Sequence, residues 1–383
     1  MKKFIWTNAI VTFCIVLSIA SLLFYFTFDR RITGFFCIGE IFPMSPYIDK
    51  SSAYIFKGKV GYDGQFFLAI ALDPTLQNKR TVQALDNPKF RYRRIGYPVV
   101  GYILGLGNSE LIPYVLVGLN MICIVAIVLL ISVLFQIEGM GPPYRWVPVL
   151  ALAIPGVWVT LCTSTADLLG TTLFMATLVG LRLGRNGVAS LSLCLACLTR
   201  ETYLAVAVIL IVLELRHHWR NTLWLGLATV PALLWNALVY VRIQEGTSGL
   251  RENFGIPFAG VLAKLQQILD GGLSIKNLYE TYSFALLMAT ALFLAVSVIR
   301  TRRYPAVVPF SVLPYLVILT ASTMHIFVYH SNYLRVFIDV FVLNILTTQR
   351  EPADFVKKGL LLLTVPASAA YVIQYIFIFL FIR

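Results

Sequence analysis

The chain has 383 residues, of which 58% are hydrophobic and 13% are charged, and its mean hydropathy is +0.80. A soluble domain carries about 25% charged and 45–50% apolar residues. The composition therefore excludes a water-soluble globule and a disordered chain, and it indicates a polytopic membrane protein. The net charge is +13. We attribute it to cytoplasmic loops and to contacts with anionic lipid or phosphate. We expect no nucleic-acid partner, because no soluble stretch is long enough for a DNA- or RNA-binding domain.

The N-terminus begins with Met1-Lys2-Lys3 and continues as an apolar run over residues 4–28. A signal-peptide core is roughly 7–15 residues long. This run is longer and is followed by no small-residue cleavage site, so we expect a retained first span with a cytoplasmic N-terminus. Ten further apolar runs predict an all-α polytopic membrane protein of about eleven transmembrane helices. They are residues 110–137, 146–161, 166–181, 188–199, 202–215, 221–241, 281–299, 305–325, 333–347 and 359–382.

Two polar stretches interrupt the runs within what we interpret as one integral membrane domain, residues 1–383. Residues 29–95 form a large, basic first loop, and residues 243–280 form a second loop that contains several glycines. Residues 96–106 are apolar but too short to span a membrane. We expect them to form an interfacial or re-entrant helix beside the first loop.

The segment 188–215 has Arg200 and Glu201 at its centre. Each half is about 18 Å of helix against a hydrocarbon core of about 30 Å. The segment is therefore either one span with a buried ion pair or two short helices that meet in a polar turn. Two helices fit the positive-inside rule better. This choice places both loops on the outer face, together with the turns at 163–167 and 325–335, and it places the C-terminus outside.

The first loop contains the sequence Gly61-Tyr62-Asp63-Gly64-Gln65-Phe66-Phe67, after which an apolar helix is expected to run to Asp73-Pro74. Asp63 at the start of this helix has two interpretations. It is either a simple N-cap or a general base in a partly desolvated site, where a raised pKa favours proton abstraction.

This motif, placed after a single N-terminal span, resembles the first outer loop of GT-C-type integral membrane glycosyltransferases, in particular bacterial proteins of cell-surface glycopolymer formation. It is more distantly similar to the GPI-anchor mannosyltransferases, which carry Trp-Asp or Tyr-Asp there. The resemblance covers the pattern of nearly the whole chain, although only a few stretches are specific. It implies that Asp63 is the catalytic residue, and we expect the adjacent Tyr62 and Gln65 to bind substrate.

Three arginines, Arg91, Arg93 and Arg94, lie beside aromatic residues in the stretch 90–98. Arginine stays charged and binds phosphate in a bidentate manner. The cluster either attracts anionic headgroups or recognises a lipid-phosphate donor. Related proteins carry a similar Tyr-x-Arg-x-x-Tyr-Pro pattern, so the resemblance implies the second role and adds Tyr97 to the candidate substrate contacts.

Further charges at the outer face are Asp167, in Ser-Thr-Ala-Asp, and the Arg200-Glu201 pair, in Leu-Thr-Arg-Glu. Proteins that this chain resembles carry an acidic residue and a Leu-Thr-Arg-Glu stretch at these places. Charges at membrane depth are costly and tend to mark sites. These three residues either support substrate binding, or Arg200 forms a structural pair with Asp167 or with Glu201.

The last polar stretch, residues 325–335, ends in Arg335, a candidate phosphate ligand. The alternative is an intrahelical pair between Arg335 and Asp339. We interpret His325 and His330 as interfacial and mainly structural, and we include His330 among the candidate substrate contacts. Their spacing matches no metal motif, so we predict no cofactor, and the sequence leaves a divalent metal open.

The chain has no Walker A, GxGxxG or GxSxG motif in a suitable setting and no cytoplasmic domain for a nucleotide sugar. The resemblance implies an inverting hexosyl-, mannosyl- or arabinosyl-type transferase that moves a sugar from a polyprenyl-phosphate donor to a glycan or lipid acceptor. Asp63 would take the acceptor proton while arginines hold the departing phosphate. We expect a multi-pass plasma (inner) membrane protein, in contact with membrane lipids, whose site faces the periplasm or exterior. The alternatives are a transporter or flippase of lipid-linked glycans and a non-catalytic membrane protein of envelope assembly.

Overall fold

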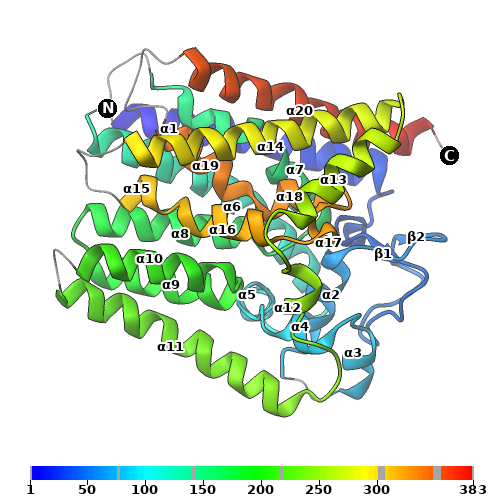
Figure 1. Ribbon diagram of the computed structural model, residues 1–383. Coiled ribbons are helices and arrows are strands. Elements are labelled where there is room, and N and C mark those ends of the chain that lie inside the picture. Colours follow the sequence, from blue (N-terminus) through cyan, green and yellow to red (C-terminus); the bar gives the residue numbers. More distant parts are fainter. Residues whose placement is uncertain are drawn as a thin grey trace.

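The protein is a bundle of helices that run along a common direction, with short elements gathered at one end (Figure 1). The structure, a computed structural model, describes residues 2–75, 78–139, 144–215, 219–300, 307–347 and 355–381. Helices make up 76% of it. In the described ranges, the sheet consists of two parallel strands of two residues each. The predicted all-α architecture is therefore confirmed.

Five helices in the described ranges are long and apolar enough to cross a membrane. Each corresponds to one of the predicted apolar runs, and the larger count of about eleven spans is not confirmed. The five are α1 (Lys2–Leu22) with its π-helical extension η1 (Leu23–Thr27), α6 (Leu111–Ile137), α11 (Trp219–Arg242), α14 (Ile275–Arg300) and α20 (Phe355–Phe381).

The first loop is folded into short elements, as its turn residues and short apolar stretches predict. These are η2 (Ile32–Phe36), β1 (Ile38–Gly39), β2 (Ile55–Phe56), α2 (Asp63–Leu72), α3 (Lys79–Gln83) and α4 (Pro88–Tyr92), and the predicted short helix α5 (Gly96–Leu104) follows. In the second loop the structure has α12 (Leu250–Asn253) and α13 (Ala259–Asp270). This loop is shorter than the predicted 243–280, because α14 already begins at Ile275.

Three of the predicted spans are not single helices. The run 146–161 is divided into η4 (Val147–Ala153) and α7 (Pro155–Thr163), because a proline disfavours helical backbone in the residue before it. The run 333–347 is divided between α18 (His330–Val336) and α19 (Ile338–Thr347). In the run 305–325, which begins outside the described residues, the structure has α15 (Val307–Phe310), α16 (Leu313–Ala321) and α17 (Met324–Phe327).

The segment 188–215 forms two helices, as predicted. These are α9 (Asn186–Thr199) and α10 (Thr202–Leu215), and they lie side by side in the bundle (Figure 1). The backbone of Arg200 is extended, with φ −151° and ψ 136°, which ends α9. The turn therefore presents Arg200 and Glu201 at the end of the bundle where the first loop packs.

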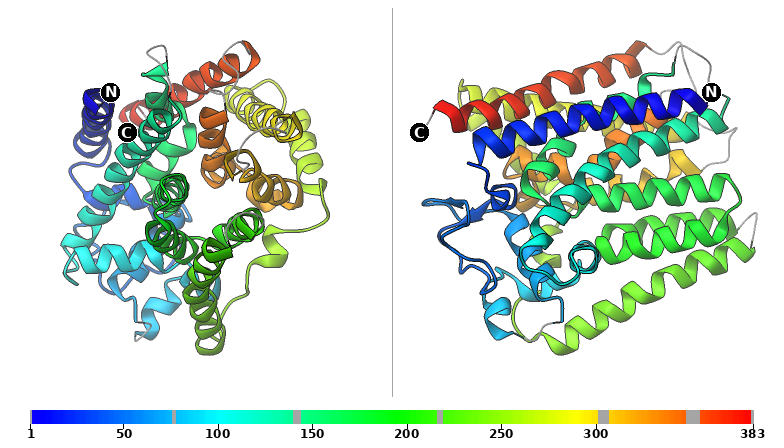
Figure 2. Two further views of the ribbon diagram at one scale, coloured as in Figure 1. Left: turned by 90° about the vertical axis from the view of Figure 1, so that its left-hand side faces the viewer. Right: turned by 180° about the vertical axis from the view of Figure 1, so that it is seen from behind.

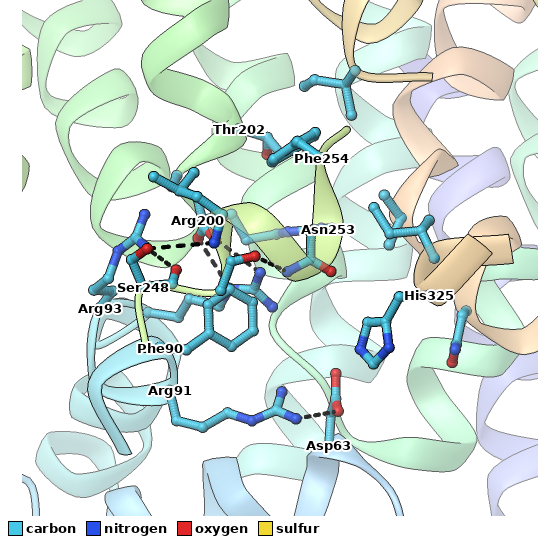
Figure 3. A pocket seen from close by; sticks show the side chains of 18 of the residues that line it. Asp63, Phe90, Arg91, Arg93, Arg200, Thr202, Ser248, Asn253, Phe254 and His325 are labelled. Carbon is cyan, nitrogen blue, oxygen red and sulfur yellow. Dashed lines mark hydrogen bonds and ion pairs between the residues drawn. The ribbon is translucent and has the colours of Figure 1, made fainter. Parts of the chain in front are cut away.

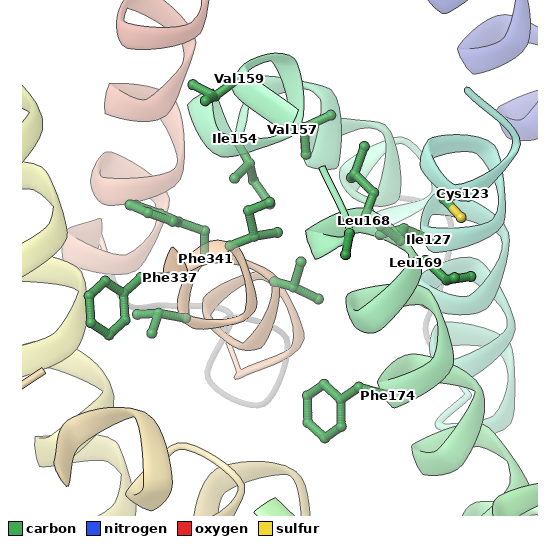
Figure 4. Close-up of a cluster of buried hydrophobic side chains, with 14 of the residues drawn as sticks. Cys123, Ile127, Ile154, Val157, Val159, Leu168, Leu169, Phe174, Phe337 and Phe341 are labelled. Atoms are coloured by element: carbon green, nitrogen blue, oxygen red, sulfur yellow. The ribbon is translucent and has the colours of Figure 1, made fainter. Parts of the chain in front are cut away.

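Apolar side chains from several helices fill the interior of the bundle. Figure 4 shows Ile127 of α6, Val157 of α7 and Leu168 of α8 (Asp167–Arg182) in one buried apolar cluster that also contains Phe341 of α19. All three are no more than 1% exposed. The first loop lies at one end of the bundle (Figure 2), where η2 packs against α6 and α7 and α2 packs against α6.

The start of α2 approaches α7 closely. A Cβ atom on Gly64 would lie 2.0 Å from the Thr163 carbonyl oxygen, so only glycine fits here without a shift of the backbone. The Gln65 side chain links β1 to the start of α2, because its Oε1 accepts from the Gly39 amide at 3.1 Å and its Nε2 donates to the Val60 carbonyl at 3.0 Å. These contacts fix the position of Asp63 on the folded bundle.

Candidate functional site

Asp63 occupies the first turn of α2, where the exposed amides of a helix N-terminus favour a negative charge. Each of its carboxylate oxygens meets an arginine. Oδ1 lies 2.9 Å from Arg91 Nη2, and Oδ2 lies 2.6 Å from Arg335 Nη2. Figure 3 shows the Asp63–Arg91 contact beside a cavity. The two arginines come from α4 and α18, so the site joins the first loop to the C-terminal part of the bundle.

The interpretation of Asp63 as a general base carried the expectation of a raised pKa, and the structure corrects this expectation. Burial alone raises the pKa of a carboxyl. Here the guanidinium groups of Arg91 and Arg335 more than offset burial, and they hold the pKa of Asp63 well below its usual range. Asp63 is therefore a weak base in this arrangement, although 18% of its side chain stays exposed.

Arg91 is held by a second carboxylate, that of Asp86. Its Nε and Nη2 donate to Asp86 Oδ1 at 2.8 Å and Oδ2 at 2.7 Å, a bidentate contact. The guanidinium also lies over the Phe66 ring, 4.6 Å from its centroid. With only 9% of its side chain exposed, Arg91 is fixed beside Asp63 and does not reach out as a headgroup contact.

Arg335 also contacts the charges of the bundle interior. Its Nη1 lies 3.4 Å from Asp167 Oδ2, while Asp167 pairs with Arg200 through its other oxygen. The predicted alternative of an Arg335–Asp339 pair is not formed, because Asp339 accepts from two tyrosine hydroxyls instead. Of the two alternatives for Arg200, the Asp167 pair is the one present.

Arg94 and Glu201 form a bidentate pair across the site. Arg94 Nε and Nη2 each lie 2.9 Å from a Glu201 oxygen, and the guanidinium lies 4.3 Å from the centroid of the Phe90 ring. Burial raises the pKa of Glu201, but Arg94 more than offsets this and lowers the pKa well below its usual range. The charge of Arg94, a predicted phosphate ligand, is therefore already neutralised by Glu201.

Arg93 differs from its neighbours in its partners. Nη1 donates to the Ser248 carbonyl at 2.7 Å and Nε donates to Asn236 Oδ1 at 3.3 Å, and both partners are neutral. Arg91, Arg93, Arg94, Arg200 and Arg335 all line a cavity of about 120 Å³. Counted within the described part of the chain, these five guanidinium groups face four carboxylates, namely Asp63, Asp86, Asp167 and Glu201. One positive charge is left in excess, and Arg93 carries it.

A second and larger cavity, of about 720 Å³, opens on the other side of Asp63. Its wall is aromatic and polar. It is lined by Phe42, Phe56, Tyr62, Tyr329, Tyr371 and Tyr375, by Gln65 and Gln374, and by His330. The two cavities meet at the Asp63 carboxylate.

The other candidate residues have the following places. Tyr62 donates from its hydroxyl to Asn332 Oδ1 at 2.7 Å, and burial raises the pKa of Tyr62 to about 12. His330 lies against Glu280, with Nδ1 2.8 Å from Oε1. Tyr97 is fully buried, donates to the Leu116 carbonyl at 2.9 Å, and lines neither cavity. It supports α6 and does not face the site.

Three residues of the site were not among the predicted site residues. Asp86, Asn332 and His325 line the cavities, and Asn332 and His325 line both. Asp86 lies five residues before Arg91, just ahead of the Asn87-Pro88 helix start, and this short spacing is a local sequence signal for the pair. His325 was named in the outer stretch 325–335 but interpreted as mainly structural, and the structure places it in the wall of both cavities.

In the described ranges, no group of three His, Cys, Asp or Glu side chains is arranged so that it could hold a metal ion. Compared with family models, with curated proteins and with solved structures, the chain matches none. The likeness to GT-C-type glycosyltransferases therefore stays a prediction from the sequence, and function is inferred from the geometry of the site.

Proposed function

We propose that this protein is an inverting glycosyltransferase that moves a sugar from a polyprenyl-phosphate donor to the hydroxyl group of an envelope glycan or lipid acceptor. The observation that carries the proposal is the position of Asp63, where an arginine-lined cavity meets a larger aromatic cavity. The first cavity suits the phosphate of the donor, and the second suits the acceptor.

The charge of the first cavity supports a phosphodiester ligand. A polyprenyl-phosphate sugar carries one negative charge on its phosphate, and the cavity has one positive charge in excess, on Arg93. When the sugar leaves, the phosphate gains a second negative charge. Guanidinium groups fixed in place beforehand stabilise such a developing charge without reorganisation.

The second cavity supports a carbohydrate-like acceptor. Its volume of about 720 Å³ is within the range of ligand pockets. Aromatic rings stack on the C–H faces of sugar rings, while the amide groups of Gln65 and Gln374 offer hydrogen bonds to hydroxyl groups. An acceptor hydroxyl that entered here would approach the anomeric carbon from the side opposite the phosphate, which inverts the configuration.

The membrane supplies the donor in this proposal. The described part of the chain has five helices of membrane-spanning length, and a lipid-phosphate donor presents its phosphate at headgroup level. We place the N-terminus in the cytoplasm and the site at the outer face of the plasma membrane, following the distribution of lysine and arginine. Asp63 then lies close to the reacting sugar, held by Arg91 and Arg335.

The test uses the full chain in proteoliposomes with radiolabelled polyprenyl-phosphate mannose or arabinose and an envelope glycan fraction. We expect release of polyprenyl phosphate and a product of inverted configuration, and we expect Asp63→Asn to remove most of this turnover. Arg30→Ala is the matched arginine control, because Arg30 is exposed and stacks on Tyr25, away from both cavities. Movement of the lipid across the bilayer without turnover would support a flippase instead, and neither activity would support an assembly role.

A further inference from the structure

We propose that His325 accepts the proton of the acceptor hydroxyl during glycosyl transfer, beside an Asp63 carboxylate that stays ionised. This inference rests on the proposed function and deepens it. Of the described residues, four line both cavities, namely Asp63, Arg91, His325 and Asn332. A group that handles the proton has to face both the donor and the acceptor, so the choice lies among these four.

The other three are occupied or unsuited. Both oxygens of Asp63 meet arginines, at 2.9 Å and 2.6 Å. Arg91 is a permanent cation, and Asn332 is an amide that already accepts from the Tyr62 hydroxyl at 2.7 Å. His325 alone combines an imidazole, a common general base in enzymes, with a side chain that has no polar partner among the described residues.

The placement of His325 supports this role. Figure 3 shows its imidazole directed into the space that Asp63 borders. The backbone beneath it is braced, because its amide donates to Thr323 Oγ1 at 3.3 Å and the Thr323 amide donates to the Asn253 carbonyl at 2.9 Å. The side chain is exposed to the cavities. His330, by contrast, is tied to Glu280 through both its ring and its amide.

The step balances as follows. The acceptor oxygen forms a bond to the anomeric carbon, and its proton moves to a ring nitrogen of His325. The bond between the anomeric carbon and the phosphate oxygen breaks, and its electron pair stays on the phosphate, which the arginines hold. The Asp63 carboxylate stabilises the imidazolium that forms, and the proton then leaves to solvent through the open cavity.

The test compares His325→Gln and His325→Ala with the unchanged protein, as full chains in proteoliposomes. The probe is labelled polyprenyl-phosphate mannose or arabinose, depending on which of the two the unchanged protein turns over. Loss of a general base typically costs about 10²–10⁴-fold. We expect kcat to fall by this amount in both variants, with the KM for the donor within a few-fold and an unchanged melting temperature. Added imidazole should restore part of the rate of His325→Ala, where the side chain leaves room, and none of the rate of Asp63→Asn.

Imidazole rescue separates proton transfer from a structural role, since a merely structural loss would not respond to a free base. If the unchanged protein turns over and His325→Gln keeps kcat within threefold, Asp63 or another group takes the proton and the inference is overturned while the proposed function stands. If the unchanged protein turns over neither probe, both are overturned together.

Discussion

The Arg94–Glu201 pair allows the most quantitative prediction. The two side chains are 12% and 20% exposed, between a buried and a surface ion pair. Removing one partner of a fully buried pair costs about 3–5 kcal/mol, while an exposed pair contributes about 1 kcal/mol or less. We therefore expect Arg94→Ala to lower the free energy of unfolding by about 2–3 kcal/mol, because it leaves the Glu201 carboxylate without its guanidinium.

The same change affects donor binding through charge. Without Arg94, four guanidinium groups face four carboxylates, and the excess positive charge of the cavity is gone. The double variant Arg94→Ala with Glu201→Ala restores that excess and leaves no orphaned carboxylate. We expect it to regain most of the lost melting temperature and part of the lost donor affinity.

The assay is thermal unfolding in detergent at a fixed scan rate, together with binding of a radiolabelled polyprenyl-phosphate sugar. Arg93→Ala is the matched control for stability, because its partners are neutral and its loss leaves no unpaired carboxylate. A double variant as unstable as Arg94→Ala alone would refute the reasoning, since the cost would then not come from the unpaired carboxylate.

Three further predictions follow from the site and its support. Arg93→Ala should weaken donor binding by roughly 10–100-fold, because it removes one charge-assisted contact of about 1.5–3 kcal/mol. Its melting temperature should change little, and donor binding equal to that of the unchanged protein would contradict the role of Arg93. Gly64→Ala should destabilise the fold and reduce turnover, because its Cβ would lie 2.0 Å from a backbone oxygen, whereas Gly187→Ala, with open space around it, should do neither. The pKa of Asp63 is lower in the folded protein than in the unfolded chain, where it is about 3.9. The ionised Asp63 carboxylate therefore contributes its full stabilisation above the unfolded pKa, and this stabilisation is lost as the pH falls through the folded pKa. The difference in melting temperature between the unchanged protein and Asp63→Asn should stay constant from pH 8 to pH 5 and shrink only in more acidic solution, and a difference that already shrinks near pH 6 would contradict the low pKa.

Features governed by local sequence were predictable. Hydropathy identifies the five long helices, and the Asp63 and Asp73-Pro74 signals give the bounds of α2. The break at Arg200 was predicted from the distribution of lysine and arginine, which favours two short helices over one span. Asp63, Arg91, Arg93, Arg94 and Arg335, which the sequence places at the predicted outer face, all line one cavity.

Features governed by tertiary contacts were not predictable from the sequence. An apolar run does not show where a helix breaks inside a packed bundle, so the divisions near Pro155 and Phe337 were missed. The low pKa of Asp63 depends on Arg335, which is 272 residues away in the chain. Sequence also cannot distinguish Arg93, with its neutral partners, from Arg94, which Glu201 neutralises, because both read as basic residues in one cluster.

The most direct test of the central claim is a structure of the full chain in a lipid nanodisc with a non-cleavable polyprenyl-phosphonate sugar. We predict that the phosphonate contacts Arg93 in the arginine-lined cavity and that the anomeric carbon lies between it and the Asp63 and His325 side chains. The sugar should point toward the aromatic cavity. A phosphonate bound at other basic residues, with both cavities empty of the analogue, would contradict the account.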